Sequence, residues 1–170
     1  MTTQSKGLIA GLSIALVAAL LSGCAPSGQQ LEVTDPWIKA TDSGMTGMFA
    51  TITNDGGVEL SLVGASTAVA GMVEIHEVVD GVMQEKAGGV VVPAGGTAIL
   101  EPGADHIMLM NLNQELVAGE TYTVVLTFSD GSSIEVQAMA RAFTGANEDY
   151  DPGRSHGEES DGHTHDGGME

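Results

Sequence analysis

Two histidines and three methionines stand close together in the middle of the sequence: His76, Met83, His106, Met108 and Met110. Imidazole nitrogens bind several transition metals, whereas the thioether sulfur of methionine selects soft ions such as Cu(I). Both groups are neutral when they bind, so together they can hold a soft monovalent ion without thiolates. This stretch therefore predicts a soft-metal site.

The alternation after His106 indicates which side chains share a face. Successive side chains of a β-strand point to opposite faces, and in the segment 106–111 the apolar residues Ile107 and Leu109 alternate with three candidate ligands. If the apolar pair faces a core, the candidate ligands line the other face: His106, Met108 and Met110. Leu112 would share that second face, so we expect the strand to end near Asn111.

A similar alternation places His76. A strand with Val73 and Ile75 on one face presents His76 on the other, and an Asp-Gly pair at 80–81 favours a hairpin that returns Met83 towards His76. A ligating histidine needs its second ring nitrogen oriented by a hydrogen bond. The sequence offers three carboxylates for that role: Glu74, Glu77 and Asp105.

The first residues are typical of an export signal. Lys6 precedes an apolar run over 8–21, which is too short for a spanning helix and ends in Leu-Ser-Gly-Cys. That ending resembles the bacterial lipobox, which implies cleavage before Cys24 and lipid attachment to its thiol; the alternative is an ordinary signal peptide with an incidental cysteine. We expect a signal peptide over 1–23, a linker over 24–30 and a lipid anchor on the outer face of the cytoplasmic membrane.

From residue 31 to residue 142 the chain predicts one all-β domain, a β-sandwich or barrel. Short β-rich runs alternate with Gly, Asp and Asn turns, and no segment has a sustained helical period. Cys24 is the only cysteine, so core packing must stabilise the fold, and we expect Met45, Met48 and Met72 to fill that core. The expected strands are 48–53, 59–63, 71–79, 89–92, 97–100, 106–111, 121–128 and 133–139.

Residues 143–170 are expected to form a disordered acidic tail, because Gly, Asp, Glu, Ser and His dominate there and little apolar surface is available for burial. The tail contains three histidines: His156, His163 and His165. Short His-rich tracts can bind metal, so one hypothesis is that the tail captures Cu(II), or Zn(II) and Ni(II). The alternative is a solvated tail whose histidines are incidental.

Charge and motifs exclude several classes of function. The net charge of -18 argues against binding to nucleic acid or to anionic lipid. The sequence has no Gly-x-Ser-x-Gly elbow, no His-Glu-x-x-His helix motif and no cysteine for a blue-copper centre in the domain. We therefore expect a protein that is not an enzyme.

The ordered motifs of the domain resemble the periplasmic PCu(A)C copper chaperones. Four segments carry the resemblance: Val73 to Met83, Gly88-Gly89, Val92 to Gly96 and His106 to Met110. It implies a cupredoxin-like Greek-key β-sandwich that binds one Cu(I) through four ligands: His76, Met83, His106 and Met108. Only six residues separate His76 from Met83, fewer than is usual in the family. If the shortened loop does not reach the site, Met110 or Met45 is the expected substitute.

The resemblance also implies a function. A membrane-anchored chaperone of this family would carry Cu(I) outside the cytoplasmic membrane and deliver it to the copper site of cytochrome oxidase subunit II or to its assembly factors. Two alternatives remain open. One is a structural or adhesive β-sandwich lipoprotein, and the other is a general metal-buffering lipoprotein that uses the histidines of the tail.

Overall fold

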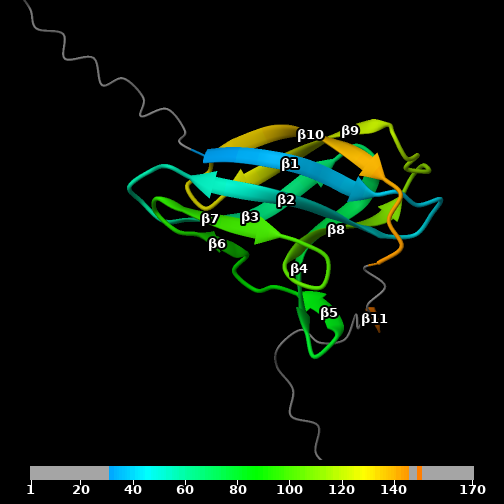
Figure 1. The fold of residues 1–170 in the computed structure, drawn as a ribbon, viewed down its shortest axis with the longest axis horizontal. Helices are drawn as coiled ribbons and strands as arrows, with labels where there is room; N and C mark the ends of the chain where they lie inside the picture. The colour runs from blue at the N-terminus through cyan, green and yellow to red at the C-terminus, as the bar shows by residue number, and fades with distance from the viewer. Residues whose placement is uncertain (1–30, 146–148, 151–170) are drawn as a thin grey trace, which may run out of the picture.

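The computed structural model describes residues 31–145 and 149–150, and these residues form β-strands and no α-helix. The part of the chain that the structure describes thus contains no helix long and apolar enough to cross a membrane. The strands are shown in Figure 1. They are β1 (Leu31–Lys39), β2 (Thr46–Asn54), β3 (Leu60–Thr67), β4 (Ala70–Val79), β5 (Val82–Glu85), β6 (Val90–Val92), β7 (Gly96–Leu100), β8 (His106–Leu112), β9 (Thr121–Phe128), β10 (Ser133–Arg141) and β11 (Asp149–Tyr150).

The strands form one hydrogen-bonded ladder in the order β11-β5-β4-β8-β2-β1-β10-β9-β3-β6, and β7 pairs with β2. Most neighbours are antiparallel, but β1 runs parallel to β10. The ladder folds back on itself as a β-sandwich, and the β4–β5 hairpin projects below it in the view of Figure 1. Strand β8 lies between β4 and β2, so any site on β8 is flanked by those two strands.

The core lies between the layers and takes side chains from most of the strands. Its fully buried members include Ile38, Met48, Ile52, Leu62, Ile107, Leu109, Val124, Leu126 and Phe128. Removing this much apolar surface from water is the main favourable contribution to folding, since no disulfide is available. One face of β4 and β8 packs into this core through Ile75, Ile107 and Leu109.

The all-β fold predicted from the sequence is confirmed, and the ends of the expected strands lie within four residues of the observed ends. The sequence did not predict β1, whose pairing with β2 shifts register between Thr34 and Trp37. Asp35 there has a positive φ of 48° and is followed by Pro36, which cannot donate to a ladder. The short strand β5 was expected only as the return of a hairpin.

The ordered structure extends beyond the expected end of the domain at residue 142. Phe143 packs edge-on against Trp37 with ring centroids 5.4 Å apart, and β11 pairs in parallel with β5. The expected signal peptide and Cys24 lie outside the described residues. The three tail histidines, His156, His163 and His165, lie outside them as well.

Candidate metal site

The β4–β5 hairpin is the element that positions Met83. Asp80 and Gly81 have φ values of 53° and 80°, and a two-residue turn with positive φ at both positions matches the twist of the flanking strands. Val79 therefore pairs with Val82, and Val78 pairs with Met83. Cross-strand partners share a face of the sheet, so the turn places Met83 beside Val78, on the face that also carries His76.

The register of β4 on β8 brings the two histidines together. His76 is the direct cross-strand partner of His106, and Glu74 is the partner of Met108. The ring centroids of the two histidines are 5.8 Å apart and their planes are inclined at 65°. His76 is 0% exposed and His106 is 3% exposed, so both imidazoles are held in a dry environment.

The alternation predicted for β8 is confirmed. Ile107 and Leu109 belong to the core of the sandwich. Met108 and Met110 lie in a second buried cluster together with Met83, and Val78 packs against it. Strand β8 continues one residue further than expected, to Leu112, but this side chain packs against the main core because Asn111 has a positive φ of 53° that interrupts the alternation.

Hydrogen bonds orient both imidazole rings. His106 Nδ1 lies 2.8 Å from the carbonyl oxygen of Ala104, so Nδ1 carries the hydrogen and Nε2 carries the lone pair. His76 Nε2 lies 2.9 Å from Glu74 Oε2, and donation to this carboxylate leaves the lone pair on the buried Nδ1. Glu74 is thus the orienting carboxylate for His76 among the three that the sequence offered.

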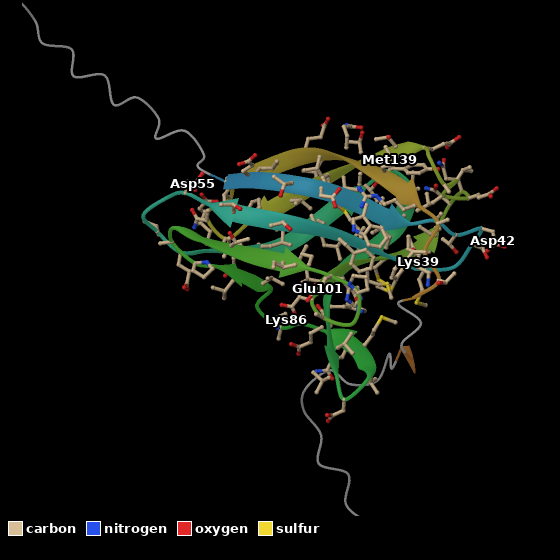
Figure 2. All side chains as sticks on the ribbon, in the orientation of Figure 1. Lys39, Asp42, Asp55, Lys86, Glu101 and Met139 are labelled. Atoms are coloured by element: carbon tan, nitrogen blue, oxygen red, sulfur yellow. The ribbon has the colours of Figure 1, made fainter. Side chains whose placement is uncertain are left out.

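The other two carboxylates meet at a lysine. Lys86 Nζ lies 2.7 Å from Glu77 Oε2 and 3.2 Å from Asp105 Oδ1, and the backbone N–H of Lys86 donates to the carbonyl of Ile75. The hydrogen bond to Glu77 raises the pKa of Lys86 above its ordinary value. Figure 2 labels Lys86 near Glu101, whose N–H donates to Asp105. Lys86 therefore joins the hairpin to the loop that precedes His106.

An aromatic wall borders the histidine pair on the side of β2. The ring centroid of Phe49 lies 6.1 Å from that of His106 and 4.5 Å from that of Trp37. Gly47 makes room for this arrangement, because a Cβ atom there would lie 2.6 Å from the Phe49 ring. The sequence did not identify Phe49 or Gly47 as neighbours of the site. Gly47 pairs with Met108, and this pairing is known only from the register of β2 on β8.

Two methionines lie elsewhere than expected. Met48 is fully buried in the core, as predicted, but Met45 and Met72 are each 42% exposed and do not fill it. Met72 is the cross-strand partner of Met110, on the face that carries the methionine cluster. Among the described residues, no group of three or more His, Cys, Asp or Glu side chains could hold a metal ion. A metal site in this part of the chain would therefore depend on methionines.

A comparison with protein families supplies the relationship. The model of the family described as "Putative lipoprotein LpqE-like" matches residues 31–140, nearly the whole described domain. The chain belongs to the LpqE-like family. It is also 37% identical over 163 residues to the putative lipoprotein Lxx21020 of Leifsonia xyli subsp. xyli, an alignment that covers 87% of this chain and 98% of that protein.

Solved structures show that the LpqE-like chain has the fold of PCuAC domains. The solution structure of Cu(I)-bound DR1885 from Deinococcus radiodurans is similar with a TM-score of 0.55 and 28% identity, covering 71% of this chain and 85% of that one. The apo PCuAC domain from PmoF1 has a TM-score of 0.59 and 23% identity, covering 66% of this chain and 94% of that one. The sandwich predicted from the sequence is thereby confirmed as PCuAC-like.

The geometry of the LpqE-like domain brings together all four residues that the resemblance implied as ligands. Two imidazoles stand side by side on β4 and β8, with Met108 two residues beyond His106 and Met83 packed in the same buried methionine cluster. The shortened hairpin therefore reaches this face of the sheet. Met110 lies in the same cluster, whereas Met45 does not belong to it and is exposed.

Proposed function

We propose that this protein is a lipid-anchored copper chaperone that binds one Cu(I) ion through His76, His106, Met108 and Met83. The observation that supports this most directly is the cross-strand histidine pair, which lies beside a buried cluster of three methionines. Such a set of neutral nitrogen and soft sulfur donors favours Cu(I) over harder ions. The similar DR1885 domain was solved with Cu(I) bound, which supports the same cargo.

The hydrogen bonds of the two imidazole rings support a choice of donor atoms for the ion. His106 would bind through Nε2, because its Nδ1 is engaged by Ala104, and His76 would bind through Nδ1, because its Nε2 is engaged by Glu74. Met108 and Met83 would supply the sulfur atoms. Met110 belongs to the same buried cluster, so it is the alternative to Met83 as the fourth ligand.

The proposed site suits transfer better than permanent storage. Thioethers and imidazoles hold Cu(I) without forming a cage of thiolates, so an acceptor with stronger soft ligands can take the ion by ligand exchange. The resemblance to the PCu(A)C chaperones favours the copper site of cytochrome oxidase subunit II, or its assembly factors, as acceptor. A lipid on Cys24 would keep the domain at the outer face of the cytoplasmic membrane. We assign binding and delivery to the protein, and no catalysis.

Titration with Cu(I) against a competing chelator tests the proposed site. The mature protein should bind one Cu(I) tightly, and a variant with His106→Ala and Met108→Leu should lose that binding. Met139→Leu is the matched control, because Met139 is exposed on β10 and two strands, β1 and β2, separate β10 from β8. Stoichiometric, tight binding by the double variant would show that the site is elsewhere.

The tail is proposed to act as a low-selectivity collector of Cu(II) through His156, His163 and His165. The structure defines where to cut, because β11 pairs with β5 and ends at Tyr150, before all three histidines. A chain that ends at Tyr150 should take up less Cu(II) and retain its Cu(I) site. Equal Cu(II) uptake by the full and shortened chains would reject this role and leave the Cu(I) site untouched.

A further inference from the structure

We propose a second soft-cation site in this protein, a surface row of three thioethers formed by Met72, Met110 and Met45. The row would bind Cu(I) or another soft monovalent cation at the exposed border of the histidine site. It goes beyond the proposed function, which assigns one ion to His76, His106, Met108 and Met83. The inference rests on strand register, on burial and on the chemistry of the donors.

Register places the first two members together. Met72 on β4 and Met110 on β8 are direct cross-strand partners, one step along the ladder from the pair of Glu74 and Met108. The Cβ atoms of directly opposite residues in an antiparallel pair are about 4.5–5.5 Å apart and point to the same face. Two flexible thioethers on such neighbouring positions can converge on one ion.

The third member comes from the other neighbour of β8. Thr46 pairs with Leu109 and Gly47 pairs with Met108, and Met45 directly precedes Thr46. Extending this register by one residue would place Met45 opposite Met110. Beyond this point the N–H of Leu112 donates to the carbonyl of Gly44 at 3.2 Å, a contact displaced by one residue at Asn111, whose φ is positive. Met45 shares its parity with Gly47, which lies on the face of Met108. Met110 therefore has a methionine on each side.

Burial distinguishes this row from ordinary core packing. Met110 is 4% exposed, but its two neighbours Met45 and Met72 are each 42% exposed. Side chains that exposed contribute little to a core, yet five of the nine methionines of the chain lie on this one face, which argues against chance placement. Figure 2 shows sulfur atoms, in yellow, gathered between Lys39 and the β4–β5 hairpin.

The donor set selects the ligand. Three neutral thioethers without a carboxylate or an imidazole bind soft monovalent ions and discriminate against Zn(II), Mg(II) and Ca(II). Met110 also belongs to the buried cluster of Met83 and Met108, so the row is continuous with the proposed primary site. An ion held by Met45 and Met72 is accessible from solvent and lies two cross-strand pairs along the same face from the histidine pair. The row is thus the position at which Cu(I) would enter and leave.

A titration of the full mature chain with Ag(I) tests the row, with methionine labelled by carbon-13 at its methyl group and observed by NMR. Ag(I) is a soft monovalent ion that does not change oxidation state under these conditions. The first equivalent should shift the methyl signals of Met83 and Met108, and further Ag(I) should shift those of Met45 and Met72. The signal of Met139, on β10, should stay in place throughout.

Variants separate this inference from the proposed function. Met45→Leu with Met72→Leu should lose the second step and keep the first, whereas His106→Ala with Met108→Leu should lose the first step and keep the shifts of Met45 and Met72. The row is refuted if Met45 and Met72 shift no more than Met139 after the first site is saturated. Absence of a first-step shift at Met83 and Met108 counts against the proposed function alone.

Discussion

His76 on β4 and His106 on β8 are direct cross-strand partners, and their ring centroids lie 5.8 Å apart in a buried setting. A register shift of one residue would move either imidazole to the opposite face, into the core of the sandwich. The packing of Ile75 and Ile107 into that core opposes such a shift. The same contacts that stabilise the fold therefore hold the proposed ligands in position.

Glu74→Leu should weaken Cu(I) binding without unfolding the domain. Glu74 Oε2 lies 2.9 Å from His76 Nε2 and fixes the orientation of the ring. Loss of such an outer partner typically lowers metal affinity by about 10–100-fold, and a chelator competition assay measures this change. Glu135→Leu, which removes an exposed carboxylate from β10, is the control. If the two variants bind Cu(I) equally well, Glu74 does not orient a ligand.

Met83→Leu and Met110→Leu should have different effects on the first Cu(I) ion. Both substitutions nearly conserve volume and should cost less than about 1.5 kcal/mol of stability. Met83→Leu removes a proposed ligand, so its loss of affinity should exceed the roughly 10–100-fold expected for an outer partner. Met110→Leu should leave the first affinity nearly unchanged. The reverse pattern, measured by the same competition assay, would assign the fourth ligand to Met110.

Gly47→Ala should destabilise the wall beside His106. The added methyl group would lie 2.6 Å from the Phe49 ring, which packs against Trp37 on one side and His106 on the other. Overpacking of this kind costs about 1–3 kcal/mol of stability, which chemical denaturation measures. The affinity for Cu(I), measured by chelator competition, should fall as well. Gly64→Ala is the matched control, since nothing lies within 4 Å of a Cβ atom there. Equal stability of the two variants would contradict the proposed steric role of Gly47.

Lys86→Met should lower the stability at neutral pH by about 1 kcal/mol or less, because the ion pairs of Lys86 are partly solvated. The hydrogen bond to Glu77 raises the pKa of Lys86 above its ordinary value of 10.5. The contribution of Lys86 is thus fully present below pH 10.5 and is lost as the pH rises through the raised pKa. Thermal unfolding of both proteins should show a difference that shrinks at alkaline pH. A difference that grows there would contradict this sign.

Much of the fold and part of the site could be predicted from local sequence patterns. The alternation after His106 correctly separated Ile107 and Leu109 from Met108 and Met110, and the Asp-Gly pair at 80–81 correctly indicated a hairpin. These predictions succeeded because side-chain parity and turn conformation depend only on neighbouring residues.

Long-range pairing could not be predicted in the same way. Strand β1 was not predicted, because Pro36 interrupts its pattern and because its parallel pairing with β10 joins distant parts of the sequence. The partner of His106 Nδ1 is the backbone carbonyl of Ala104, and Phe49 joins the site only through the register of β2 on β8. A backbone acceptor and a strand register do not depend on particular residue types in the sequence. The contacts of Ala104 and Phe49 with the site are therefore known only from the structure.

X-ray absorption at the copper edge of the Cu(I)-loaded mature protein tests the central claim most directly, because it counts the sulfur and nitrogen neighbours of the ion. We predict two sulfur and two nitrogen neighbours, and we predict that the sulfur neighbours disappear in the variant with Met83→Leu and Met108→Leu. A first coordination shell of nitrogen and oxygen alone in the unmodified protein, or sulfur neighbours that persist unchanged in that variant, would contradict the assignment of the copper site to His76, His106, Met108 and Met83.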